Sequence, residues 1–260
     1  MSVEGTTLPK VIEEAEILSH GIPIAGVDIL TLVAPQIART SLPGQFVQVS
    51  VPVHGGFLRR PLGIAETSRA DGWIRLIYRQ VGSGTEALAN AAAGAYVSIL
   101  GPLGHGFNTS LKHPLLVGGG MGLTPLLFFA ATHPNVSVLM GGRTKEEVFW
   151  EEIYRPHVRE CFITTDDGSY GTQGFVTTLL PQLLAEGDYD GIAVCGPPVM
   201  MERVAVIAAE HGIPCEVSLE KRMACGLGAC LSCAVDTKNG RRKVCKDGPV
   251  FPAEEVYDAL

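Results

Sequence analysis

The chain has 260 residues and a formal net charge of −7 at neutral pH, from 27 acidic and 20 basic side chains. This balance offers no general attraction for a phosphate backbone, so a nucleic-acid partner is not expected. Hydrophobic residues make up 46% of the sequence and charged residues 18%, which excludes a disordered chain and predicts globular units with sizeable cores.

The amino-terminal sequence MSVEGTTLPK has an acid at Glu4 and no apolar core of a secretory signal, so we expect a cytoplasmic protein. Thiols stay reduced there, and the odd total of seven cysteines also argues against a disulfide framework. No charged residue occurs between Pro114 and Gly142, but GGGMG and HPN interrupt this run. It therefore indicates strand, loop, helix and strand of an α/β domain, and no membrane partner is expected.

Residues 1–103 are rich in short β-branched segments between Gly and Pro, which predicts an antiparallel β barrel. The expected strands include KVIEEAEIL, DILTLVA, GQFVQVSV and WIRLIYR, with one short helix near TEALANAA.

Residues 104–219 alternate strand and helix patterns, which predicts a parallel sheet with helices on both faces. The expected strands are LLVGGG, VSVLMGG, CFITT, GIAVCGP and PCEVSL, and the helices are LTPLLFFAA, KEEVFWEEI, FVTTLLPQLLAE and VMMERVAVIAAE. Sheets of this kind bind ligands beyond the carboxyl ends of their strands, where the glycine-rich turns fall.

Residues 220–260 form a third, cysteine-bearing module that is too small to have much core of its own, so a metal or another staple is expected. The spacing of Cys225, Cys230, Cys233 and Cys245 is C-x4-C-x2-C-x11-C. Its first part matches the plant-type 2Fe-2S pattern, whereas zinc sites more often pair two C-x2-C knuckles. Zinc and unliganded thiols remain the alternatives, and Cys161, Cys195 and Cys215 are interpreted as small buried hydrophobes, with Cys195 a partial exception.

Two glycine-bearing turns follow strands of the predicted sheet: GGGMGLTP at 118–125 and CGPP at 195–198. Flexible backbone at a helix start suits a pyrophosphate, although such turns also serve packing alone. In the barrel, Arg59, Arg60 and Arg79 lie near the loop that carries Gly84 and Thr85, where phosphate binding and simple solvation of the arginines are both open.

Taken together, these motifs resemble those of the ferredoxin–NADP reductase superfamily. SLEKRMACGLGACLSCAV, VCKDGPVF, TDDGSYGTQGFVT and GGRTKEEVFW closely resemble the electron-transfer subunits of dihydroorotate dehydrogenase B. The resemblance covers nearly the whole chain. It implies an oxidoreductase subunit of pyrimidine (UMP) biosynthesis whose barrel binds FAD, whose α/β domain binds NAD, and whose cluster connects FAD to FMN in a separate catalytic subunit, as a heterotetramer of two plus two.

The resemblance also assigns residues. It implies cluster ligands at the four clustered cysteines, and it implies no catalytic residue for dihydroorotate in this chain. The implied FAD residues are Arg60, Pro61, Leu62, Gly63, Ile77, Tyr78, Arg79, Gly84 and Thr85, where Gly63 replaces the family's Ser. The implied NAD residues are Gly119, Gly120, Gly122, Cys195, Gly196 and Pro197.

A cluster passes single electrons, NAD accepts a hydride and flavin does both, so FAD is expected between them. Met223, Leu227 and Leu231 are candidate partner contacts, and Arg143 and Lys145 could meet a 2′-phosphate of NADP. Two alternatives remain: a diaphorase subunit of a sulfhydrogenase or transhydrogenase-type complex, and a non-enzymatic binding module braced by zinc.

Overall fold

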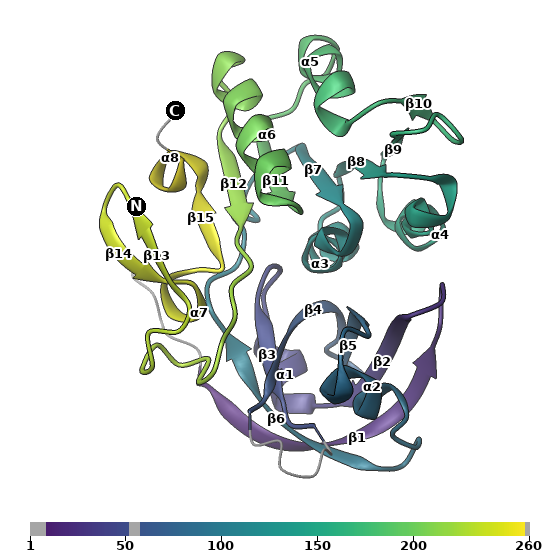
Figure 1. Ribbon diagram of the computed structural model, residues 1–260, viewed down its shortest axis with the longest axis vertical. Coiled ribbons are helices and arrows are strands. Elements are labelled where there is room, and N and C mark those ends of the chain that lie inside the picture. The colour runs from purple at the N-terminus through teal and green to yellow at the C-terminus, as the bar shows by residue number, and fades with distance from the viewer. Residues whose placement is uncertain (1–8, 52–57, 258–260) are drawn as a thin grey trace.

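The structure is a computed structural model that describes residues 9–51 and 58–257. Residues 1–8, which bear on the expectation about a secretory signal, lie outside this range. The chain forms a barrel, a sheet flanked by helices, and a carboxy-terminal segment that lies beside both (Figure 1). Within the described residues, no helix is long and apolar enough to cross a membrane.

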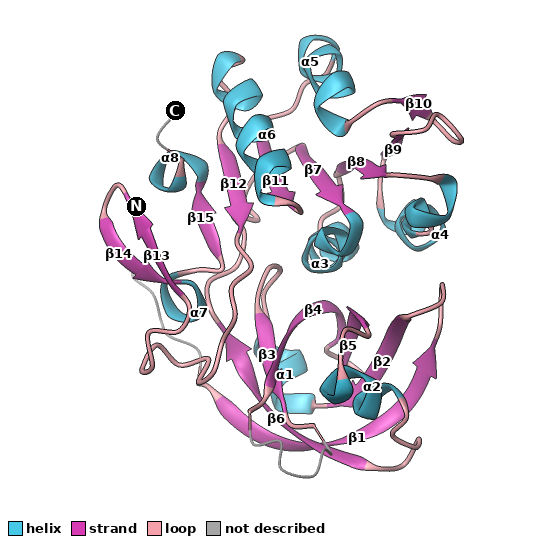
Figure 2. Cartoon of the chain, in the orientation of Figure 1, coloured by secondary structure: helices cyan, strands magenta, loops and turns pink. Residues whose placement is uncertain are grey.

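The amino-terminal part is a closed antiparallel barrel, which confirms the predicted fold of this region (Figure 2). Its strand order is β1-β2-β5-β4-β3-β6, and β6 pairs back onto β1. The strands are β1 (Val11–Gly21), β2 (Val27–Val33), β3 (Phe46–Val49), β4 (Arg60–Ser68), β5 (Trp73–Arg79) and β6 (Tyr96–Leu103), with helices α1 (Pro35–Thr40) and α2 (Ser83–Ala89).

Side chains alternate along the barrel strands, so that each strand has an inner and an outer face. Val47 and Val49 of β3 pack inside the barrel with Ile74 and Leu76 of β5. Ile77 points outward into a different apolar cluster, which it shares with helix α3 (Leu123–Thr132). The outer face of β5 therefore contacts the second part of the molecule.

The second part is built on a seven-stranded sheet in the order β10-β9-β8-β7-β11-β12-β15. Its strands are β7 (Pro114–Gly119), β8 (Ser137–Gly142), β9 (Glu160–Thr165), β10 (Thr172–Gln173), β11 (Gly191–Cys195), β12 (Cys215–Ser218) and β15 (Val250–Pro252). The first six are parallel, as predicted, and β15 pairs with β12 antiparallel.

Helices cover both faces of this sheet. They are α3 (Leu123–Thr132), α4 (Trp150–Tyr154), α5 (Val176–Glu186) and α6 (Pro198–Glu210), with 3-10 turns η1 (Gly120–Gly122), η2 (Lys145–Val148) and η3 (Arg155–His157). Helix α3 lies between the sheet and the barrel, and its Phe128 joins the apolar cluster inside the barrel (Figure 1). Helices α5 and α6 pack on the opposite face through Val176 and Val204.

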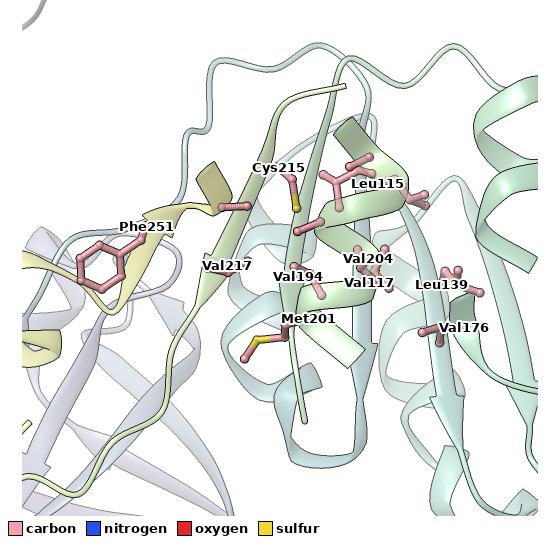
Figure 3. Packing of buried hydrophobic residues seen from close by; sticks show 14 of the residues in the cluster. Leu115, Val117, Leu139, Val176, Val194, Met201, Val204, Cys215, Val217 and Phe251 are labelled. Atoms are coloured by element: carbon pink, nitrogen blue, oxygen red, sulfur yellow. The ribbon is translucent and has the colours of Figure 1, made fainter. Parts of the chain in front are cut away.

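The carboxy-terminal segment contains the hairpin β13 (Ala234–Thr237) and β14 (Gly240–Lys243), then α7 (Val244–Asp247), β15 and α8 (Ala253–Val256). Strand β15 adds to the edge of the sheet, and Phe251 lies beside Val217 of β12 (Figure 3). Cys233, Val244 and Cys245 belong to the same apolar cluster as this part of the sheet. The small segment thus shares a core with its neighbour, which its length alone did not predict.

Candidate functional site

The two glycine-bearing turns lie at the point where the sheet changes direction. From β7 the chain continues to β8 and β9 on one side, whereas β11 and β12 lie on the other side. The parallel register places Cys195 beside Gly118, so both turns leave the sheet at the same edge. Such a switch point is where open α/β sheets bind their ligands.

The glycines allow these two turns to touch. A Cβ atom on Gly122 would lie 2.3 Å from the carbonyl oxygen of Cys195, and one on Gly119 would lie 2.9 Å from Sδ of Met200. Gly120 has a φ of +55° and open space around its Cα. The structure therefore brings Gly119 and Gly122 against 195–197, whereas Gly120 borders open space.

Cys195 itself offers its backbone rather than its thiol. The side chain is buried, and Sγ lies 3.5 Å from the carbonyl oxygen of Ser218, to which it donates. Burial raises the pKa of this thiol far above its ordinary value. The thiol is therefore neutral near pH 7, in agreement with its interpretation as a small buried hydrophobe.

The predicted flavin segments of β4 and β5 lie on the barrel face that meets α3. A Cβ on Gly63 would lie 3.8 Å from Cβ of Pro125 and 3.9 Å from Cγ2 of Thr124. The Thr124 hydroxyl donates to the carbonyl oxygen of Ile77 at 3.3 Å. Tyr78 points into the barrel core, so only its backbone is available to a ligand on this face.

The arginines divide into two roles. Nη1 of Arg59 donates to the carbonyl oxygens of Ser98 at 2.6 Å and Gln48 at 3.2 Å, which makes Arg59 a tie between strands. The guanidinium of Arg60 lies over the start of α2, 2.7 Å from where a Cβ of Gly84 would be. The hydroxyl of Thr85 is occupied by its own loop, because it accepts from Val81 N at 2.9 Å. Arg60 is thus the cation best placed beside this turn.

The four clustered cysteines form two pairs. Cys233 and Cys245 are neighbours, since Cys245 N donates to Cys233 Sγ at 3.4 Å. Cys225 and Cys230 are also neighbours, since each side chain shifts the pKa of the other thiol. Within the residues that the structure describes, no three His, Cys, Asp or Glu side chains surround a single ion position. Two cysteine pairs suit a cluster with two iron atoms, whereas a zinc site needs all four ligands around one point.

Backbone N–H groups point at the sulfur atoms of this loop. Leu227 N donates to Cys225 Sγ at 3.3 Å, Gly228 N to Cys245 Sγ at 3.1 Å, and Cys245 N to Cys233 Sγ at 3.4 Å. Gly226 and Gly228 have φ values of +69° and +83°, which side chains rarely tolerate. The glycines therefore allow the tight turns that aim these donors, an arrangement that suits the negative sulfur atoms of an iron–sulfur cluster.

Sequence reasoning missed Ser232, which lies between the candidate ligands Cys230 and Cys233. Its Oγ lies 3.1 Å from Sγ of Cys230 and accepts from Ala224 N at 3.1 Å. This hydroxyl, with backbone donors, lowers the pKa of the exposed Cys230 thiol to about 6. By contrast, burial and the neighbouring Cys233 raise the pKa of Cys245 to about 12. The sequence signal for this contact is a hydroxyl residue two positions after the candidate ligand Cys230.

Arg143 and Lys145, the candidates for a 2′-phosphate, are both engaged. Nε of Arg143 donates to Glu147 Oε1 at 2.8 Å, and its backbone N donates to Oε2 at 2.9 Å. These hydrogen bonds lower the pKa of Glu147. The ammonium of Lys145 lies 5.4 Å from the ring centre of Tyr170. Glu147, which sequence reasoning overlooked, thus offsets the charge of Arg143.

Comparison with known proteins agrees with this geometry. The barrel, sheet and cysteine loop define a reductase of the ferredoxin–NADP reductase fold with an added cluster segment. Residues 220–257 match the family described as the iron-sulfur cluster binding domain of dihydroorotate dehydrogenase B. The chain belongs to the dihydroorotate dehydrogenase B (NAD(+)) electron transfer subunits.

Two curated relatives carry that name. The protein of Desulforamulus reducens is 39% identical over 234 residues, which cover 86% of this chain and 89% of the relative. That of Geobacillus thermodenitrificans is 40% identical over 240 residues, covering 87% and 91%.

Two solved structures extend the comparison. An NADH-dependent reduced ferredoxin–NADP oxidoreductase studied for flavin-based electron bifurcation has a TM-score of 0.83 and 30% identity, covering 98% of this chain and 91% of that chain. A ferredoxin NADP+ reductase from Neisseria gonorrhoeae, solved with FAD and NADP, has a TM-score of 0.62 at 15% identity, covering 77% and 92%. The second likeness concerns the fold alone.

Proposed function

We propose that this chain relays electrons between the FMN of a dihydroorotate-oxidising catalytic subunit and NAD⁺ during pyrimidine biosynthesis in the cytoplasm. Bound FAD would exchange electrons singly with a 2Fe-2S cluster and in pairs, as hydride, with NAD. The observation that carries the proposal is the paired cysteine loop beside the barrel. Gly226 of that loop packs directly against Gln48 of β3, so a cluster and a flavin would be neighbours.

Each part of the chain has one task in this proposal. Residues 1–103 hold FAD, with Arg60 beside its phosphates and the 60–63 and 77–79 segments along the face toward α3. Residues 104–219 hold NAD at the two glycine turns. Residues 220–260 hold the cluster, where backbone donors stabilise the charge on sulfur.

The exposed side of the cysteine loop suits a protein partner. Leu227 and Leu231 are 45% and 57% exposed next to the exposed Cys230, whereas Met223 packs into the neighbouring apolar cluster. Exposed apolar side chains around a redox centre are typical of a docking surface. We therefore assign Leu227 and Leu231 to contact with the FMN subunit, in a two-plus-two assembly, and we assign Met223 to the core.

The first experiment is an anaerobic visible spectrum of the purified chain, with iron, sulfide, zinc and flavin assayed on the same sample. We expect about two irons and one FAD per chain, both reduced when NADH is added. Zinc without flavin would instead establish the zinc-braced binding module and refute an electron relay.

A pair of variants tests the ligand assignment. Cys245→Ser removes a proposed ligand and should abolish the iron while leaving FAD bound. Cys215→Ala is the control, because Cys215 is also buried in the same apolar cluster but lies in β12, outside the loop. Iron retention in both variants would refute the ligand set. Coupling to a hydrogenase subunit but not to the FMN subunit would favour the diaphorase alternative.

A further inference from the structure

Gln48 is a polar residue in the middle of a buried strand. Its neighbours Val47 and Val49 point into the barrel, so its side chain lies on the outer face of β3, the face that also carries Phe46. Phe46 packs in the cluster that contains Cys233 and Cys245. Gln48 has no exposed surface, and it therefore lies in the contact between the barrel and the cysteine loop.

The side-chain amide of Gln48 has no hydrogen-bond partner. Within the described part of the chain, both Nε2 and Oε1 are buried and unpaired. An unsatisfied buried polar group costs about 1–3 kcal/mol, and native proteins seldom leave one without a reason. Gln45, three residues earlier, shows the ordinary case: Oε1 accepts from Leu42 N at 2.9 Å, and Nε2 donates to Gly104 O at 2.7 Å.

Two predicted cofactor sites adjoin this amide. A Cβ on Gly226, the residue after Cys225, would lie 2.7 Å from Cγ of Gln48 and 2.8 Å from Nε2. On the other side, Gln48 pairs across the sheet with Pro61 of the flavin segment. The backbone carbonyl of Gln48 is used by Arg59, which leaves only the amide available. The amide thus lies where the barrel and the cluster loop meet.

We propose that Gln48 donates a hydrogen bond from Nε2 to sulfur at the Cys225 end of the 2Fe-2S cluster and thereby sets its reduction potential. This inference rests on the proposed function, because it requires the cluster. A donor to sulfur favours the reduced, more negative cluster, so it raises the potential. Gln48 acts in this way as a positioning residue, without contact to NAD or to dihydroorotate.

The test compares reduction potentials of the holo subunit with those of Gln48→Leu, in a redox titration followed by EPR for the cluster and by absorbance for FAD. Leucine fills similar space without a donor. We expect the cluster potential to fall by about 59 mV, a tenfold change in its one-electron equilibrium, and the FAD potential to stay the same. Ile74→Val is the control, because it trims the barrel core away from the loop.

Other outcomes overturn the inference. A shift of the FAD potential alone would assign the amide to the flavin, and no shift of either would refute a cofactor role. If Gln48→Leu loses iron, Gln48→Met is titrated in its place. Thermal unfolding of the apo chains then shows whether iron is lost because a contact to the cluster is missing or because the fold is weakened. Loss of iron from both variants with undiminished apo stability supports binding to the cluster, whereas weakened apo chains would show a structural role. If the wild-type chain itself contained no iron, the proposed function would be refuted before the role of Gln48 could be tested.

Discussion

Gly63 is the residue at which this chain departs from the flavin motif of its family. Its backbone is not in the left-handed region, and a Cβ there would make ordinary van der Waals contacts with Pro125 and Thr124. The barrel face can therefore accept a side chain at this position without strain. Under the proposed function, the absence of a serine hydroxyl would remove one hydrogen bond to FAD, while Arg60 lies beside Gly84.

Restoring that hydroxyl should tighten FAD binding. One neutral hydrogen bond contributes about 0.5–1.5 kcal/mol, so Gly63→Ser is expected to lower the dissociation constant for FAD by roughly 2- to 12-fold. Titration of the apo chain with FAD, followed by flavin fluorescence, measures the change. Gly63→Ala is the matched control, since it adds the Cβ alone. Equal gains from alanine and serine would show that packing, not the hydroxyl, is responsible.

Among the elements, the loop from β8 into η2 bears on the choice between NAD and NADP. Both of its cations have partners: Arg143 binds Glu147, and Lys145 lies over Tyr170. A 2′-phosphate would have to compete with a carboxylate that already holds the guanidinium in a charge-assisted pair. The loop therefore favours the cofactor without that phosphate.

Glu147→Gln should weaken this preference, because it removes the negative charge that holds Arg143. We expect the ratio of kcat/KM for NADPH to that for NADH to rise by roughly 1.5- to 5-fold, in line with one exposed ion pair. Diaphorase assays with an artificial electron acceptor measure both values. Glu146→Gln provides the comparison, since that carboxylate accepts from Thr144 instead. An identical rise in both variants would mean that general charge, rather than Arg143, sets the preference.

The elements also show how far the sequence alone could go. Strands such as β5 and β7 were predicted because their apolar patterns are local. Strands β4 and β6 have the sequences RPLGIAETS and YVSILGPL, which contain Gly and Pro. Their local pattern does not predict a strand, because pairing with neighbouring strands of the barrel stabilises them.

The candidate site shows the same limit. Spacing alone gave the four candidate ligands, but the pairing of their sulfurs depends on the loop backbone. Asn239-Gly240 is a local turn signal for the hairpin β13–β14. Gln48 and Gly226 are far apart in sequence, so only the folded chain brings them together.

At the scale of the whole molecule, one side of the cysteine loop is exposed, and its other side contacts the barrel. Leu231 is exposed and has a φ of +61°, an unusual conformation for leucine. Lys243 and Lys246 pack their aliphatic stems near Gly228 of the same loop. An exposed apolar tip on this loop suits a partner whose docking surface is apolar at its centre.

Leu231→Glu should weaken this docking by at least tenfold, because it places a charge at the centre of the proposed contact. Analytical ultracentrifugation with the FMN subunit measures assembly, and NADH-dependent reduction of an artificial acceptor shows whether the variant keeps its cofactors. Ile22→Glu is the control, since Ile22 is 70% exposed on the barrel. Undisturbed assembly of Leu231→Glu would place the partner on another face.

The antiparallel pairing of β15 with β12 affects how the protein is made. Until β15 pairs, β12 is an open edge of the sheet, and the segment with the four cysteines is fixed to the sheet at one end only. Only when β15 arrives does the chain between them become a closed loop. Iron delivered before that pairing would meet four cysteines on a segment tethered at one end, whereas iron delivered afterwards would meet a loop fixed at both ends.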